Sequence, residues 1–179
     1  MVRGSILFLD FKSAANLFLC TKRITVQSYI FAHKNKGDRK TMQNRLVLDA
    51  NDIDQMLSAA TGEALANGWA VSVALVDEGG HLLAFRRLPG ASPSSARIAI
   101  DKARSAALTR RPTRFFADML AAGELGASSL RGVVPMGGGL PLLHGEHALG
   151  GIAASGVKCE FDVLIAAAGL AALNLERNP

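Results

Sequence analysis

The sequence predicts an α+β domain in which an antiparallel sheet and a cover of helices form two layers. Segments whose apolar residues recur at helical spacing alternate with pairs of period-two segments that are joined by short turns. The predicted order is helix, hairpin, two helices, hairpin, helix, and strands joined by such tight turns must be antiparallel. The chain has 179 residues, of which 49% are hydrophobic, so it is long enough for one packed domain.

The composition excludes several classes of protein. Two cysteines, Cys20 and Cys159, cannot build a disulfide scaffold or a four-cysteine zinc site. The longest apolar run, from Val163 to Leu173, is well short of the roughly 20 residues that cross a bilayer. We therefore expect no membrane helix.

The positive charge is concentrated at the start of the chain. Residues 1–41 hold eight Lys/Arg and two Asp, a net charge of +6, whereas residues 42–179 hold 12 basic and 13 acidic groups, a net charge of −1. We interpret 1–41 as a disordered or non-native extension and 42–179 as one domain, with Met42 as an alternative start to Met1. Because the domain is near neutral, its charge does not indicate a nucleic-acid partner. We expect a cytoplasmic protein, although a transit peptide or an atypical export signal is an open alternative.

The first predicted elements are a helix and a hairpin. Asp49 resembles an N-cap, apolar residues then recur at helical spacing, and Asn67-Gly68 is a plausible end. The segment 69–76 alternates with period two and is apolar on both faces, which is typical of a central strand. Residues 77–80 form a turn, and 81–88 return as the antiparallel partner.

The second half predicts two further helices, a hairpin and a last helix. Ser92-Pro93 is a capping hydroxyl before a proline suited to the first helical position, and small residues line one side of the helix up to about residue 108. A short helix is expected at 115–122 and a loop at 123–139. Two strands, 140–144 and 147–155, are joined by Gly145-Glu146. The last helix, about 160–175, is apolar almost all round, so a second subunit is expected to cover its second side.

Three histidines of the domain stand beside turns. His144 and His147 are directly opposed across the predicted hairpin, about 5 Å apart at Cβ. Together they could ligate a metal, or either could meet a haem iron, or both could simply be solvated. No cysteine or acid is placed as a third ligand, so a structural zinc site is not expected. His81 is interpreted as a solvated turn residue.

Two other features could recognise a ligand. Arg87 ends a strand before a turn, and a guanidinium there could clamp a carboxylate through both oxygens, or form an internal ion pair. Gly137-Gly138-Gly139 permits either close approach to a flat ligand or an unusual turn. It lacks the Lys-Ser/Thr ending of a phosphate loop, so nucleotide binding is not expected. The position of Asp162 in the first turn of the last helix is explained by the helix dipole alone.

Six short motifs in order resemble the GlcG/HbpS family, whose domain also forms the C-terminal part of PduO-type proteins. They are Val73 to Leu82, Arg87 to Ala91, Ser95 with Lys102-Ala103, Gly138 to Pro141, Gly150 to Gly156, and Asp162. The resemblance covers about residues 46–174. It departs from the family at Pro89, where an Asp is usual, at Ala154 to Val157, and in a first helix without histidine.

The resemblance implies a profilin-like sandwich, with a sheet of about five strands, that assembles into homodimers or larger even-numbered oligomers. It also implies binding of haem or a related tetrapyrrole, with some members described as haem-degrading and others as accompanying small-molecule catabolism. The cofactor-binding residues would be drawn from one set: Arg87, Thr113, Gly138, Gly139, Pro141, His144 and His147. The propionates would lie on Arg87 or Lys102.

A different class of function is kept beside this one. One branch of the family looks like a cofactor-independent lyase that acts on hydroxylaminobenzoate. In such a lyase or isomerase of a small aromatic or organic acid, Arg87 would clamp the substrate carboxylate. Lys102, Glu124 or a histidine would then move protons, and no cofactor or metal would be needed.

Overall fold

The computed structural model describes residues 45–173. The elements in this range follow the predicted order and are, along the chain, α2 (Ala50–Ala66), β1 (Ser72–Asp77), β2 (Leu82–Arg87), α3 (Pro93–Thr109), α4 (Thr113–Ala121), the 3-10 helix η1 (Leu125–Ser129), β3 (Gly139–His144), β4 (His147–Ser155) and α5 (Cys159–Ala172). The expected boundary between an extension and the domain, at residues 41 and 42, lies outside the described residues.

The strands form one antiparallel sheet in the order β2-β1-β4-β3. Its central pair is in register with Val73 opposite Ala154 and Leu75 opposite Ile152. The α+β class with an antiparallel sheet is therefore confirmed. Within residues 45–173 the sheet has four strands rather than about five.

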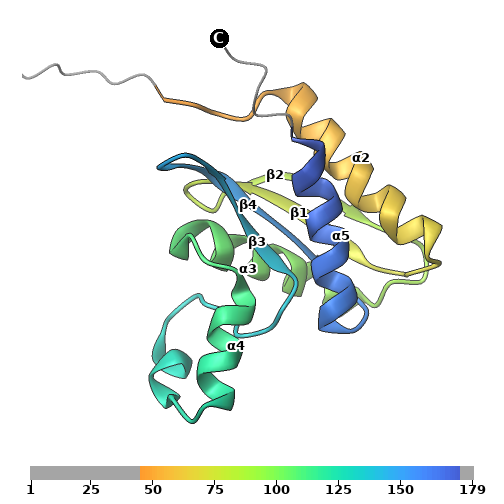
Figure 1. Ribbon diagram of the computed structural model, residues 1–179. Helices are drawn as coiled ribbons and strands as arrows, with labels where there is room; N and C mark the ends of the chain where they lie inside the picture. Colours follow the sequence, from red (N-terminus) through yellow and green to blue (C-terminus); the bar gives the residue numbers. More distant parts are fainter. Residues whose placement is uncertain (1–44, 174–179) are drawn as a thin grey trace, which may run out of the picture. The chain divides into compact units, whose positions relative to one another are not determined.

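Helices cover both faces of this sheet, so the domain has three layers rather than two (Figure 1). Val73 and Leu75 of β1 point into a core shared with α2 and α5, whereas Ala74 and Val76 point toward α3. The apolar character of both faces of β1 requires this double cover. On the α3 side, helix and sheet approach so closely that only glycine fits at position 151. A Cβ there would lie 2.4 Å from the Ala103 carbonyl oxygen.

The helix starts follow the predicted capping residues. The Asp49 side chain accepts a hydrogen bond from the Asp52 N–H, and the Asp52 side chain accepts one from the Asp49 N–H, which makes a capping box. Ser92 caps α3 through the Ser95 backbone N–H, and Pro93 occupies the first turn. Helix α3 ends at Thr109 and is capped by Arg110, whose backbone is left-handed with φ 54°. Both predicted starts are confirmed.

Helix α5 is apolar on nearly every side, but its neighbours within this chain cover one side. Ile165 and Ala166 are buried against α2 and the sheet, whereas Leu164 is 52% exposed and Phe161 is 36% exposed. The second apolar side of α5, which we expected a second subunit to cover, is therefore exposed in the single chain. No helix in residues 45–173 combines the length and apolar character needed to cross a membrane.

Candidate functional site

A buried ion pair links the helices on the two faces of the sheet. Lys102 of α3 donates from Nζ to Asp162 Oδ2 of α5 at 2.9 Å, and the two side chains are 1% and 2% exposed. The same Nζ donates to the Ala154 carbonyl oxygen at 3.2 Å. This pair therefore ties α3, β4 and α5 together at the end of the sheet where β4 finishes.

Burial dominates the electrostatics of this pair. It raises the pKa of Asp162 above its ordinary value, although the hydrogen bond and charge of Lys102 and a longer hydrogen bond from the Val157 N–H (3.4 Å) act in the opposite direction. The helix dipole alone is therefore not the explanation of Asp162, because its carboxylate is paired with Lys102, a partner that was not predicted. The available signal was the place of Lys102 on the side of α3 that also carries Ala99, Ala103 and Ala106, all buried.

The glycine loop packs directly against the ion pair. A Cβ on Gly138, where φ is +117°, would lie 2.7 Å from Asp162 Cβ, 2.8 Å from the Ala154 carbonyl oxygen and 2.9 Å from Lys102 Nζ. A Cβ on Gly139 would lie 2.7 Å from the Lys102 carbonyl oxygen. Gly138 thus has an unusual backbone conformation, and both glycines let the loop pack tightly against the ion pair. These contacts account for the two glycines without a bound ligand.

Thr113 belongs to the same buried cluster. Its hydroxyl accepts a hydrogen bond from the Gly139 N–H at 3.0 Å and the side chain is fully buried at the start of α4. It holds the glycine loop against α4, and a haem iron could not reach this hydroxyl without opening the cluster. The structure thus brings Lys102, Thr113, Gly138 and Gly139 together, with Asp162 as the residue that completes them.

The two histidines lie at the other end of β3. His144 and His147 are register partners across the turn Gly145-Glu146, as predicted, with His144 half-buried and His147 exposed. Gly139 and His144 are the first and last residues of β3, five steps apart, which is about 17 Å along the strand. Pro141 lies between them on the edge strand, opposite Gly151. The expected cofactor-binding residues are therefore divided between two ends of the sheet within one chain.

Arg87 and Glu124 lie apart from both groups. Arg87 donates from Nε and Nη2 to the Ala91 carbonyl oxygen at 2.9 and 2.7 Å, and so fixes the turn that leads to α3. Glu124 is exposed just before η1, which packs against α4. Strands β2 and β3 are opposite edges of the sheet, and α4 packs beside β3. Arg87 and Glu124 therefore do not converge on a common site within one chain.

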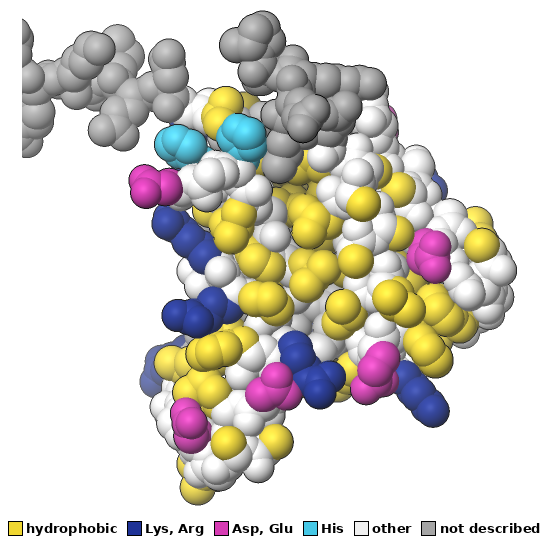
Figure 2. Space-filling model, in the orientation of Figure 1, with side chains coloured by type: hydrophobic (Ala, Val, Ile, Leu, Met, Phe, Trp, Pro, Cys, Tyr) yellow, Lys and Arg dark blue, Asp and Glu magenta, His cyan; other side chains and the backbone are white. Residues whose placement is uncertain are grey.

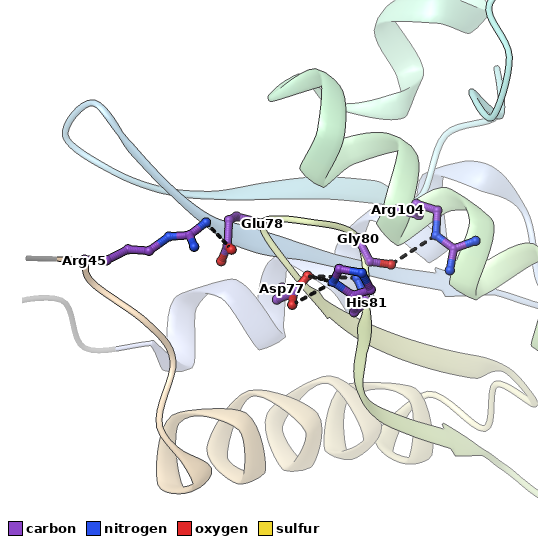
Figure 3. Close-up of polar contacts among 6 residues, drawn as sticks. All are labelled: Arg45, Asp77, Glu78, Gly80, His81 and Arg104. Carbon is purple, nitrogen blue, oxygen red and sulfur yellow. Dashed lines mark hydrogen bonds and ion pairs between the residues drawn. The ribbon is translucent and has the colours of Figure 1, made fainter. Parts of the chain in front are cut away.

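The turn between β1 and β2 is held by side chains from three segments (Figure 3). Asp77 accepts hydrogen bonds from the His81 backbone N–H (2.8 Å) and lies 3.1 Å from the His81 Nδ1. Partial burial alone would raise the pKa of Asp77, but these contacts with His81 outweigh it and lower the pKa. Arg104 donates to the Gly80 carbonyl oxygen at 3.0 Å, and Arg45 pairs with Glu78. The His81 side chain is largely exposed, and its contacts with Asp77 close the turn.

An apolar surface extends over the outward sides of α5 and β3 (Figure 2). On α5, Phe161 and Leu164 are large hydrophobic residues that remain exposed, and Trp69 stacks on Phe161 with ring centroids 4.7 Å apart. Figure 2 also shows histidine side chains at one corner of this surface and Lys or Arg side chains along its border. We call it the α5–β3 face. An apolar plane, imidazoles and cations are the groups that suit a flat macrocycle with an iron and propionates.

A family model described as haem degrading protein HbpS-like matches residues 48–171. The chain belongs to this family. The resemblance to GlcG and HbpS found in the sequence is thereby confirmed. In this HbpS-like chain, the matched range includes the buried ion pair, the glycine loop and both histidines of the hairpin.

Individual relatives agree with the family assignment. Protein GlcG of Escherichia coli K12 is 33% identical over 114 residues, which are 64% of this chain and 85% of GlcG. The crystal structure of a double mutant of Streptomyces reticuli HbpS has a TM-score of 0.70 at 29% identity and covers 77% of this chain and 94% of its own. The PduOC:heme complex has a TM-score of 0.67 at 30% identity, with 72% and 96% covered.

Proposed function

We propose that this HbpS-like chain binds haem or a related tetrapyrrole on the α5–β3 face, as an accessory protein of small-molecule catabolism. The observation that carries the proposal is the apolar face itself, with Phe161 and Leu164 of α5 exposed and histidines at its corner. Monomeric proteins rarely leave large contiguous apolar patches open, and such patches mark sites of binding. A similar solved structure is a haem complex, which supports the same ligand.

Two kinds of side chain would contact the ligand. The apolar side chains of the face would contact the macrocycle, and His144 or His147 would supply one imidazole to the iron. Thr113 and Lys102 are enclosed and already bonded, so neither is assigned a ligand contact. Bound haem iron can supply the oxidative chemistry by which a macrocycle is degraded, and the protein's part in such a reaction is binding and orientation.

The alternative, a cofactor-independent lyase, finds less support in the geometry. The residues proposed for it lie far from one another. Arg87 is at one edge of the sheet, Lys102 is inside the core, and Glu124 is beside η1. Lys102 is neutralised by Asp162 and has no access to a substrate in this conformation. General acid–base catalysis requires hydrogen-bond reach to the reacting proton. We therefore propose the haem function alone.

Titration of the full chain with haemin tests this proposal. We expect a saturable Soret band, and we expect the double variant His144→Ala/His147→Ala to lose or shift it because the iron loses its imidazole. His81→Ala is the matched control, since the His81 ring contacts Asp77 in the β1–β2 turn and is not part of the β3–β4 hairpin, so the band should be unchanged.

Two results would contradict the proposal. The absence of any titratable band would remove haem binding altogether. A band that is identical in the wild type and in the double variant would remove the histidines as ligands, and the face would then have to bind haem without them.

We further propose that the haem on the α5–β3 face lies in a cleft between two copies of the chain, which would make a homodimer or a larger even-numbered oligomer. Leu164, 52% exposed on an otherwise apolar helix, supports this. We expect Leu164→Asp to shift the protein toward the monomer in light-scattering measurements, because a charge would be buried in the interface. The exposed Leu65→Asp on α2 is the control, and an equal shift in both variants would argue against this interface.

A further inference from the structure

The hairpin of β3 and β4 presents two imidazoles on one side of a tight turn. His144 and His147 are register partners, and register partners in antiparallel strands project to the same face. Gly145 occupies the first turn position with φ +57°, which is the position where a two-residue hairpin turn favours glycine. The backbone thus holds the pair in place before any ligand arrives.

This spacing suits a single small ion. Directly opposed residues have Cβ atoms about 4.5–5.5 Å apart, within reach of one another's ring nitrogens. Two imidazoles on one Zn²⁺-sized ion, each with a bond of about 2.0–2.1 Å, bring their nitrogens to about 3 Å. A haem iron, by contrast, would be held by only one of these two imidazoles.

The surroundings favour a cation. His147 is exposed and His144 half-buried, so an ion could reach both from solvent. The charged residue of the hairpin from Gly139 to Ser155 is Glu146, in the turn between the histidines, and this hairpin holds no Lys or Arg. Imidazole ligands select Cu²⁺, Ni²⁺ or Zn²⁺ over Mg²⁺ or Ca²⁺. Among residues 45–173, no group of three or more His, Cys, Asp or Glu is placed to hold a metal, so water would complete the coordination.

We propose that His144 and His147 form an open two-histidine site for a divalent transition-metal ion in the haem-free chain. The site differs from a structural zinc site, since it uses two protein ligands and leaves exchangeable positions. It does not depend on the proposed haem function, because it needs the hairpin alone.

Calorimetric titration of the haem-free full chain with Ni²⁺ tests the proposal. A His33→Ala background removes the histidine that lies outside the described residues. We expect one Ni²⁺ per chain, and His144→Ala and His147→Ala should each weaken binding on the order of 100-fold, because the second imidazole binds intramolecularly. His81→Ala is the matched control and should bind as tightly as its parent.

A second measurement separates ligand loss from misfolding. Saturating Ni²⁺ should raise the melting temperature of the parent and of His81→Ala, and it should not raise that of the two hairpin variants, whose melting temperatures without metal should equal the parent's. Absence of Ni²⁺ binding in the parent, or binding unchanged by either hairpin substitution, would overturn the proposal. Failure of haem to bind would leave this result unaffected, so the two proposals fail separately.

Discussion

Replacing Lys102 with methionine is expected to lower the free energy of unfolding by about 3–5 kcal/mol, because the Asp162 carboxylate is then left buried without a counter-charge. Both side chains are at most 2% exposed, so water cannot solvate the orphaned charge without opening the structure. The Ala154 carbonyl oxygen also loses a donor. Urea denaturation of the wild type and the variant measures the change.

A double variant separates the orphaned charge from lost packing. Lys102→Met/Asp162→Leu removes both charges and keeps apolar volume, and replacement of a buried ion pair in this way is often neutral or stabilising. We therefore expect the double variant to be more stable than Lys102→Met alone. The single variant Asp162→Leu completes the comparison. If the losses in unfolding free energy of Lys102→Met and Asp162→Leu add up to that of the double variant, within about 0.5 kcal/mol, the two residues do not interact as described.

The cost of Lys102→Met should also depend on pH. Burial already raises the pKa of Asp162, and loss of Lys102 removes the contacts that act against burial. An acid whose pKa is higher in the folded than in the unfolded state binds more protons when folded, so its contribution to stability falls as pH rises. The penalty should therefore be smaller at about pH 5 than at about pH 7. An equal or larger penalty at the lower pH would contradict a buried carboxylate.

The elements could be predicted from the sequence because their signals are local. Asp49, Ser92-Pro93 and Gly145-Glu146 fix helix starts and a turn through contacts within four residues, and each was confirmed. The third layer was not predicted, although the apolar character of both faces of 69–76 contained the signal. Which helix covers which face depends on contacts between distant segments, and periodicity does not report these.

The candidate site was harder to predict for the same reason. Lys102 and Asp162 are 60 residues apart, and no local pattern links them. For Gly138 and Gly139 the sequence left open a flat ligand or an unusual turn, and the atoms that pack against Gly138 come from distant segments in α3, β4 and α5. The cross-strand placement of His144 and His147, in contrast, follows from a two-residue turn and was predicted.

Substituting Gly138 with alanine is the second change for which we expect a large loss, about 2–5 kcal/mol of unfolding free energy. Overpacking costs about 1–3 kcal/mol, and a left-handed conformation adds about 1–2 kcal/mol. Here both apply, since φ is +117° and the new Cβ would meet three atoms of the ion-pair cluster at 2.7–2.9 Å. Two of those atoms belong to a backbone carbonyl and a helix-anchored Cβ, which cannot move away cheaply.

Two control glycines separate these causes. Gly139→Ala has a clash with the Lys102 carbonyl oxygen without a left-handed backbone, so about 1–3 kcal/mol is expected. Gly68→Ala has φ +68° and no atom within 4 Å, so strain alone should cost about 1 kcal/mol. If Gly138→Ala were no less stable than Gly68→Ala and instead lost haemin affinity, the glycine would serve a ligand rather than the ion pair. A large stability loss, with unchanged haemin affinity in the folded fraction, is the result that internal packing requires.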